Sequence, residues 1–418
     1  MTILGIAETT VTSLMRPLTD PSLDRDALAD RFARATWTGI AEPGDRPAGR
    51  LVNVLGAETA LALLLDRRAG SALADALRAG SAGDAEPDDR EEFEAAVARW
   101  VPRLSRESAL RALTQAARFG VRLMSPDDAE WPAGFADLGD HGPIAIWMRG
   151  RRESLTTVAR SIALVGARAA TGYGEHVTID VAAGLVDRGF TIVSGAAYGI
   201  DGAAHRATLA SRGTTIAFLA GGLDRFYPSG HEALLTRIMD SGAILTEVPC
   251  GTAPTKWRFL QRNRLIAAAS AATVVIEAGW RSGSLNTAGH AAALGRPLGA
   301  VPGPVTSTAS AGCHRLLREF DAVCVTNADE MAELVPLDPT AVGNIESPTD
   351  EERHHAGPEA SGVRLRLLDA LSNRSGRSVD AIAILSGLAP DRVRAELGLL
   401  ELEGTVIERP SGWVRTTP

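Results

Sequence analysis

One short segment of the chain concentrates the positive charge and the aromatic rings that can bind an extended anion. Residues 254–264 read PTKWRFLQRNR, and no acidic residue occurs between Glu247 and Glu277. The cations of this segment are Lys256, Arg258, Arg262 and Arg264. Lys256 is the only lysine of a chain whose formal net charge is −8 at pH 7. The segment is therefore a local basic site on an acidic protein, and its chemistry is anion binding.

Two aromatic residues, Trp257 and Phe259, alternate with these cations. Single-stranded nucleic acid is held in this way, because bases stack on aromatic rings while cations neutralise the phosphates. The alternative is that the rings belong to the core of an amphipathic segment. The sequence leaves that alternative open, more so for Trp257 than for Phe259.

Four other glycine-rich segments carry residue types that suit phosphate. They are GARAATGYG (166–174), SGAAYGID (194–201), GGLDRFYPSG (221–230) and RSGSLNTAG (281–289). Glycine allows close approach of a backbone, hydroxyls donate hydrogen bonds and arginine supplies charge. The candidate donors are Ser194, Ser282, Ser284, Thr287, Arg168 and Arg281. In any single segment the glycines can simply make a tight turn, but five such segments together favour an anionic ligand.

The elements that position these segments have the pattern of a parallel sheet in an α/β fold. From about residue 115, short apolar runs alternate with helix-like segments, and near-continuous apolar runs indicate strands covered on both faces. The clearest strands are 161–167, 191–196, 215–222, 243–248, 272–279 and 297–303. Ligands of such sheets bind beyond the carboxyl ends of the strands. We expect all five segments, including 256–264, to be loops at that edge.

Composition divides the chain into four parts. Residues 1–110 form a helical domain and residues 111–336 the sheet domain, while residues 337–360 are polar, acidic and rich in proline and glycine, as in a linker. Residues 361–418 predict three helices followed by a hairpin, which is the winged-helix arrangement. The third of these helices offsets its arginines with acids, which favours a partner-binding or structural role over DNA binding for this domain.

Composition also excludes several classes of protein. No stretch approaches the length of a membrane span, and the N-terminus lacks a basic region before an apolar core, so we expect a cytoplasmic protein without membrane contact. Three widely spaced cysteines without a CxxC pair favour neither a disulfide framework nor a zinc site. The sole lysine is not in a P-loop, and GARAATGYG does not have the spacing of a dinucleotide fingerprint. We expect no metal and no cofactor.

Three acidic residues have both a structural and a catalytic interpretation. Asp201 and His205 lie four residues apart at a predicted helix start, but no third ligand or nucleophile occurs at useful spacing, so Asp201 is better read as a helix cap. Glu247 and Glu277 each end a predicted strand, where a carboxylate can orient an arginine as well as take part in chemistry.

Five motifs in this order resemble the bacterial DNA-processing protein A family, also called DprA or Smf. They are ALVGAR, VSGAAYGIDGAAH, AGGLDRFYP, FLQRNRLIAAAS and EAGWRSGSLNTAGHA, and the resemblance is strong over about residues 115 to 335. It implies an extended Rossmann-like core, with an N-terminal helical domain and a C-terminal winged-helix domain. It also implies a homodimer that binds single-stranded DNA without catalytic turnover and loads the RecA recombinase on incoming DNA during natural transformation.

Residue by residue, the family's Gly-Ser-Arg motif is Gly166-Ala167-Arg168 here, without the serine hydroxyl. The family's Phe-Pro-x-Arg-Asn-Arg motif has Leu260 in place of proline. The resemblance implies DNA contacts at Gly166, Arg168, Ser194, Gly195, Gly199, Asp201, Gly221, Gly222, Lys256, Phe259, Arg262, Asn263, Arg264, Arg281, Ser282, Gly283 and Ser284.

Two other functions are alternatives to DNA binding of this kind. One is a Rossmann-like nucleotide-binding enzyme of the phosphoribohydrolase type. Such enzymes carry a PGGxGT signature, and the segment EAGWRSGSLNTAG does not contain it. The other is a winged-helix transcription regulator, which would require duplex binding by the acidic third helix.

Overall fold

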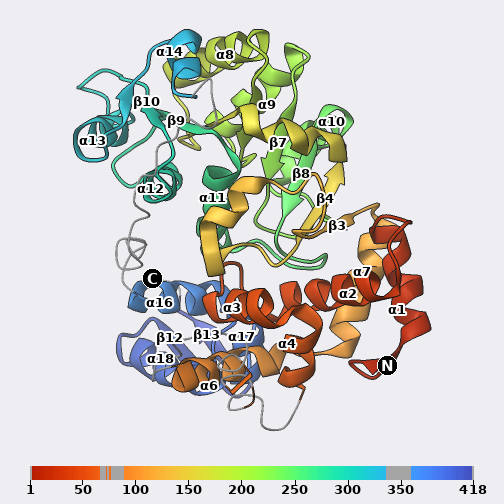
Figure 1. Ribbon diagram of the computed structural model, residues 1–418. Helices are drawn as coiled ribbons and strands as arrows, with labels where there is room; N and C mark the ends of the chain where they lie inside the picture. Colours follow the sequence, from red (N-terminus) through yellow and green to blue (C-terminus); the bar gives the residue numbers. More distant parts are fainter. Residues whose placement is uncertain (1, 66–71, 73–74, 77–88, 336–358, 417–418) are drawn as a thin grey trace.

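The computed structural model describes residues 2–65, 72, 75–76, 89–335 and 359–416 (Figure 1). The predicted linker, residues 337–360, lies almost wholly outside the described residues. Within the described ranges, no helix combines the length and the apolar character needed to cross a bilayer.

The N-terminal part is helical, as predicted. It contains a short hairpin of β1 (Thr2–Ile3) and β2 (Ile6–Ala7), helices α1 (Glu8–Met15), α2 (Arg25–Ile40), α3 (Arg46–Leu55), α4 (Ala57–Leu64), α6 (Asp89–Trp100) and α7 (Arg106–Arg118), and the 3-10 turns η1 (Arg16–Leu18) and η2 (Val101–Arg103). Asp24, Asp45 and Ser105 each accept a hydrogen bond from a backbone N–H of the helix that follows, which fixes where α2, α3 and α7 begin. The Trp37 and Trp100 rings meet edge to face at 5.2 Å in the core of this unit.

A nine-stranded sheet forms the centre of the molecule, in the order β11-β10-β9-β5-β6-β7-β8-β4-β3. The strands are β3 (Arg122–Met124), β4 (Ile146–Gly150), β5 (Ser161–Gly166), β6 (Thr191–Ser194), β7 (Thr215–Phe218), β8 (Ala243–Thr246), β9 (Ala272–Glu277), β10 (Leu298–Ala300) and β11 (Val323–Cys324). Only β4 among them runs antiparallel to its neighbours. The mostly parallel sheet and all six predicted strands are confirmed, although each strand ends one to four residues earlier than its apolar run.

Helices cover both faces of the sheet because successive apolar side chains of a strand such as β5 point to opposite faces. Ile162 and Leu164 of β5 pack under α8 (Gly172–Asp187), α9 (Ile200–Ala210) and α14 (Ala328–Glu333). Ala163 and Val165 pack under α11 (Lys256–Ala269), α12 (Ser284–Ala293) and α13 (Ala311–Glu319), with the 3-10 segments η3 (Ala133–His141) and η4 (Arg152–Arg160). Helix α10 (Glu232–Ser241), preceded by the turn η5 (Ser229–His231), packs over β7 and β8.

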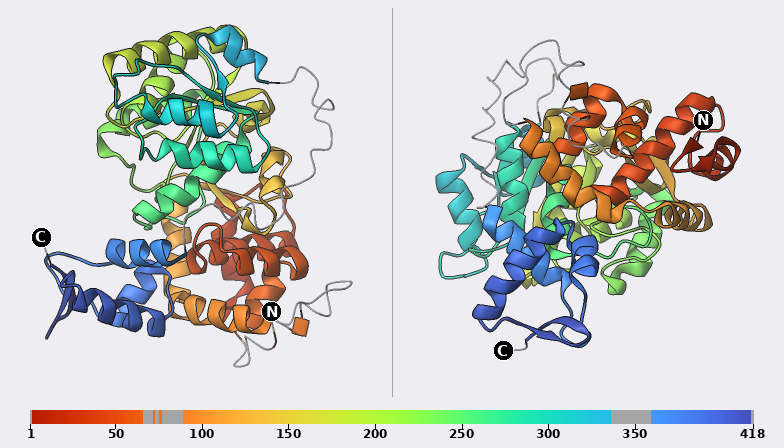
Figure 2. Two further views of the ribbon diagram at one scale, coloured as in Figure 1. Left: turned by 90° about the vertical axis from the view of Figure 1, so that its left-hand side faces the viewer. Right: turned by 90° about the horizontal axis from the view of Figure 1, so that it is seen from below.

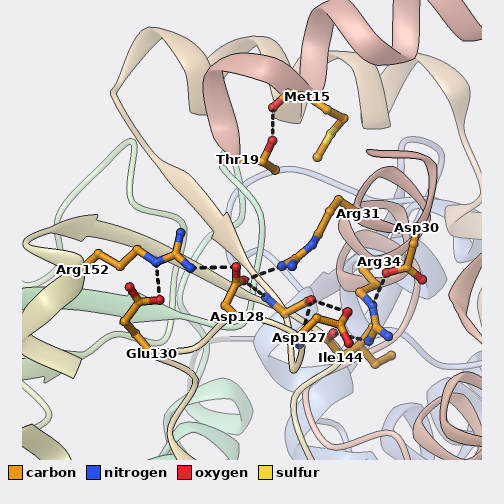
Figure 3. A network of polar contacts seen from close by, with 11 residues as sticks. Met15, Thr19, Asp30, Arg31, Arg34, Asp127, Asp128, Glu130, Ile144 and Arg152 are labelled. Carbon is orange, nitrogen blue, oxygen red and sulfur yellow. Dashed lines mark hydrogen bonds and ion pairs between the residues drawn. The ribbon is translucent and has the colours of Figure 1, made fainter. Parts of the chain in front are cut away.

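A buried network of ion pairs between arginine and acidic side chains connects the N-terminal unit to the sheet domain (Figure 3). Arg31 of α2 pairs with Asp128, which also accepts a hydrogen bond from Arg152 at 2.8 Å. Arg152 donates a second bond, of 2.6 Å, to Glu130. Since these side chains are largely buried, the pairs fix the orientation of α2 against the loop that follows β3.

The C-terminal part has the predicted winged-helix arrangement. Helices α16 (Glu359–Ala370), α17 (Val379–Ser386) and α18 (Pro390–Leu402) precede an antiparallel hairpin of β12 (Val406–Arg409) and β13 (Gly412–Arg415). Figure 2 shows this unit beside the N-terminal helices, and in its left view the sheet domain lies above both. Its contacts there include a hydrogen bond of 2.7 Å from Arg103 of η2 to the carbonyl of Ile384, and one of 3.3 Å from the Trp257 backbone N–H to Asp369 of α16.

Candidate nucleic-acid interface

The basic segment does not form the loop that we expected. Helix α11 begins at Lys256 because the Thr255 side chain accepts a hydrogen bond from the Arg258 N–H at 3.2 Å. Leu260 stands where the related motif has proline, and leucine is compatible with a helix interior. The side chains of 256–264 are therefore distributed around a helix, and only some of them face the edge of the sheet.

The five segments do meet at one edge, as predicted. They follow β5, β6, β7, β8 and β9, which are neighbours in the order β9-β5-β6-β7-β8. Four of the segments lead into or begin α8, α9, α11 and α12, so the N-terminal ends of these helices point to the same edge. The dipoles of these helices contribute positive potential to this edge.

Arg262 is the buried cation of this edge. Its side chain occupies the space above Gly195, where a Cβ atom would lie 1.5 Å from the guanidinium Nη1. Asp201 lies beneath it and accepts hydrogen bonds from the N–H groups of Gly195 at 3.1 Å and Ala197 at 3.3 Å. The expectation that Asp201 caps a helix is therefore wrong: Gly199 is the N-cap of α9, and Asp201, inside the first turn, binds N–H groups of the preceding loop and supplies nearby negative charge.

Arg262 retains unused donor capacity. It is 6% exposed, its Nε atom has no hydrogen-bond partner, and it forms no ion pair with a carboxylate among the described residues. Burial lowers the pKa of Arg262 to about 10, an effect that Asp201 opposes and Arg168 reinforces. A buried guanidinium with free donors favours the approach of an anion.

Phe259 and Arg168 complete the group around Arg262. The guanidinium of Arg168, an exposed residue after β5, lies 4.9 Å from the Phe259 ring centroid, and that of Arg262 lies 5.8 Å from it. The Tyr227 ring packs against Phe259 at 5.6 Å. We call Arg168, Tyr227, Phe259 and Arg262 the Phe259 cluster. Two cations and two aromatic rings there offer charge and stacking surface within one small region.

Sequence reasoning did not single out Tyr227, although it lies in the segment 221–230. The sequence did contain a sign of its role, because an aromatic residue in a loop at the edge of a sheet seldom packs into the core. Its ring is 48% exposed.

Several of the predicted contact residues form bonds that hold the edge together. Arg264 forms a bidentate ion pair with Glu247, at 2.6 and 2.8 Å, and both side chains are buried. The Ser194 hydroxyl donates to the Leu164 carbonyl at 2.6 Å. The Asn263 amide donates to the Gly283 carbonyl at 3.3 Å, which ties α11 to the loop after β9.

Five of the six predicted glycines, all except Gly283, are sites of close packing. Gly199 has a φ of +75°, and a Cβ there would lie 2.2 Å from the Ala167 carbonyl oxygen. The corresponding nearest contacts are 2.6 Å for Gly166, 2.9 Å for Gly221 and 2.5 Å for Gly222. These glycines let neighbouring edge loops touch, which positions Arg168 and the start of α9.

The remaining predicted cations are exposed. Lys256 is the first residue of α11, and Arg281 and Gly283 are exposed in the loop after β9. In that loop the Ser282 and Ser284 hydroxyls lie 2.8 Å apart. Lys256 and Arg281 thus extend the positive charge of the edge on either side of the Phe259 cluster.

Trp257 and Arg258 face other units of the protein. The Arg366 guanidinium of α16 lies 5.5 Å from the Trp257 ring centroid, and Arg258 pairs with Glu42 at 2.7 Å. Trp257 is therefore part of a contact between units, which answers the question that the sequence left open for this ring.

Asp201 and His205 do not form an accessible acid–base pair. His205 is fully buried, with Nδ1 2.7 Å from the Thr215 hydroxyl, and burial lowers its pKa to about 3. Burial raises the pKa of Asp201, although Arg262 opposes the effect. Glu277 accepts bonds from the N–H and hydroxyl of Thr171 at 2.8 and 2.7 Å, so it caps the start of α8. The described residues contain no group of three histidine, cysteine or acidic side chains placed to hold a metal ion.

Comparison with known proteins extends over most of the chain. The family model for DNA recombination-mediator protein A matches residues 122–336, and that for the DprA winged helix domain matches residues 351–412. A DNA processing protein DprA of Mycobacterium tuberculosis is 49% identical over 308 residues, covering 71% of this chain and 77% of that protein. Protein Smf of Escherichia coli is 34% identical over 317 residues, covering 75% and 82% respectively. The X-ray structure of DprA from Streptococcus pneumoniae has a TM-score of 0.57 and 28% identity, over 73% of this chain and 97% of that one.

Proposed function

Because the chain belongs to the DNA recombination-mediator protein A family, we propose that it binds single-stranded DNA at the carboxyl edge of its sheet and acts there as a recombination mediator. The observation that carries this proposal is the Phe259 cluster, in which a ring lies between an exposed and a buried guanidinium. Phosphates would be neutralised by Arg168 and Arg262 while a base stacks on Phe259 or Tyr227. Such binding has little sequence preference, because every base has a stacking face.

The proposal divides the predicted contact residues into two groups. Arg168, Lys256, Phe259, Arg262, Arg281, Ser282, Gly283 and Ser284 face the edge or lie exposed on it and contact the strand. Gly166, Ser194, Gly195, Gly199, Asp201, Gly221, Gly222, Asn263 and Arg264 position the loops that carry them. Arg264 belongs to the second group because its donors are engaged by Glu247.

The further steps of the proposed function concern partners. We infer that the strand-bound protein, as a cytoplasmic homodimer, loads RecA recombinase on incoming DNA during natural transformation. The family's description as a recombination mediator supports a recombinase partner. The role involves no catalytic turnover and no cofactor, and hydrolysis of nucleoside monophosphates by the purified protein would contradict it.

The test compares single-strand binding by the wild-type protein, Arg168→Ala and Arg237→Ala over a series of salt concentrations. Arg237 is the control because it is also exposed, but lies in the middle of α10. Losing one phosphate contact should weaken binding evenly across sequences and lower the slope of log affinity against log salt by about 0.7. Equal affinity and slope in Arg168→Ala and Arg237→Ala would refute the assignment of this edge, and preference for duplex DNA would refute the proposed ligand.

A further inference from the structure

The three tyrosines of the chain all lie at the carboxyl edge of the sheet. Tyr173, Tyr198 and Tyr227 follow β5, β6 and β7, and their side chains are 43%, 49% and 48% exposed. Trp280 follows β9 and is 58% exposed. Exposed rings scattered over a surface need no explanation, but these four lie in loops or a first helical turn directly after neighbouring strands of one edge, whereas among the described residues the other exposed aromatic residue, Phe119, follows α7.

The order of the strands arranges these rings in a row. Trp280, Tyr173, Tyr198 and Tyr227 follow β9, β5, β6 and β7, which are neighbours in that order, and Phe259 of α11 lies against Tyr227 and Arg168. At about 4.8 Å between strands, the five strands β9 to β8 span roughly 19 Å. Four neighbouring strands are therefore each followed by a ring of the row, and the helix after β8 supplies the fifth.

Exposed cations accompany the rings on the same segments. Arg281 is adjacent to Trp280, Arg168 precedes Tyr173, Arg225 lies two residues before Tyr227, and Lys256 lies three before Phe259. The four cations are exposed and form no ion pair with a carboxylate of the described chain. The edge thus repeats the pairing of ring and positive charge that binds a single strand.

Neighbouring groups hold each ring while leaving part of its surface open. The Tyr173 hydroxyl donates to the Pro302 carbonyl at 2.6 Å, and the Tyr198 ring meets His231 edge to face at 4.8 Å. The Arg315 guanidinium lies 5.3 Å from the Trp280 ring centroid. Rings held in this way lose little further freedom when a base stacks on them, which favours binding.

We propose that these rings form a base-stacking row, along which a single strand crosses the ends of β9, β5, β6, β7 and β8. Tyr198 stacks a base beside the Phe259 cluster, which itself includes Tyr227, and Tyr173 and Trp280 extend the row toward β9. This inference rests on the proposed function and adds a direction and a length to it: the strand runs across the sheet, and longer strands engage more rings.

The test uses Tyr198→Ala and Tyr198→Phe, with labelled oligothymidylates of increasing length and an abasic strand of matched length. Since stacking contributes roughly 1–3 kcal/mol per base, Tyr198→Ala should lower the affinity for long oligothymidylates about 5- to 140-fold. Tyr198→Phe keeps the ring and should retain wild-type affinity. The salt slope and the affinity for the abasic strand should not change, because no phosphate contact is lost.

Two results overturn the inference while leaving the proposed function intact: equal oligothymidylate affinity in Tyr198→Ala and the wild-type protein, or an equal loss for the abasic strand. Failure of the wild-type protein to bind any single strand would instead overturn the proposed function. Because Tyr198 is half exposed, we expect its variants to have the same urea midpoint of unfolding as the wild-type protein. This measurement is the control that each binding comparison uses folded protein.

Discussion

Glu42 should be the most sensitive charged residue for the stability of this protein. It follows α2 and pairs with Arg103 of η2 and with Arg258 of α11, and all three side chains are at most 10% exposed. The winged-helix unit joins the same junction. A Cβ on Gly387 would lie 2.7 Å from the Glu42 Cγ and 2.8 Å from an Arg366 nitrogen. One carboxylate thus compensates buried positive charge contributed by three parts of the chain.

The exchange Glu42→Gln removes the negative charge and keeps the size of the side chain. Arg103 and Arg258 would then be buried without a counter-charge, and breaking a buried pair in this way costs about 3–5 kcal/mol. We expect a loss of this size in the free energy of unfolding, measured by urea denaturation at pH 7.

Glu403→Gln is the matched control. Glu403 also pairs with an arginine, Arg364, but their side chains are 47% and 43% exposed. Surface pairs contribute about 0–1 kcal/mol, so this variant should stay close to the wild-type protein. If Glu42→Gln loses no more stability than Glu403→Gln, the reasoning about the buried junction is wrong.

The same exchange should change how stability depends on pH. Burial alone would raise the pKa of Glu42, but Arg258 and Arg103 outweigh it and hold the pKa well below its ordinary value of 4.5. A lowered folded-state pKa stabilises the fold above the unfolded-state pKa, and this contribution declines as pH falls below 4.5. At about 1.4 kcal/mol per pH unit, the difference between wild type and Glu42→Gln should be about 2 kcal/mol smaller at pH 3 than at pH 7. A difference that is constant across this range would contradict the lowered pKa.

Two further exchanges test how the edge is built. Arg264→Met leaves Glu247 buried and unpaired, so it should cost about 3–5 kcal/mol in urea unfolding, whereas folded protein at low urea should keep its single-strand affinity; a selective loss of affinity would instead make Arg264 a DNA contact. Gly195→Ala places a methyl group 1.5 Å from Arg262 and should weaken single-strand binding, with a cost of about 1–3 kcal/mol in stability. Gly289→Ala in α12 is its control, because nothing lies within 4 Å of the added Cβ, and equal effects of the two would refute the packing argument.

The sheet could be predicted from sequence because buried parallel strands are near-continuous apolar runs. The runs at 161–167 and 272–279 gave β5 and β9 almost to the residue. Three strands of the sheet, β3, β4 and β11, were missed, and β3 and β11 have only three and two residues, which carry no usable period. The loop expected over 256–264 was wrong because the prediction gave too little weight to Thr255, whose side chain caps a helix there.

The roles of individual arginines could not be predicted in the same way. Arg168 and Arg264 both occur in motifs that resemble DNA contacts. Arg168 is exposed, whereas Arg264 is only 3% exposed and pairs with Glu247. The partner carboxylate lies 17 residues away in the chain, and only the fold brings the pair together. The types of residue in the sequence therefore located the site. The burial and the ion pairs of each side chain, which only the structure shows, separate the proposed DNA contacts from the residues that position them.

The helical period of α11 explains how one basic segment serves two purposes. Successive residues of an α-helix are rotated by about 100°, so Trp257 and Arg264 lie on nearly the same side, while Phe259 and Arg262 lie close to the opposite one. The first side meets the winged helix and Glu247, and the second faces Arg168 and Gly195. The first turn of α11 is thus fixed by its contacts with the other units, and this fixed turn in turn holds Phe259 and Arg262 in place for an anion. A loop at the same position would leave both side chains to be ordered by the ligand, at a cost in affinity.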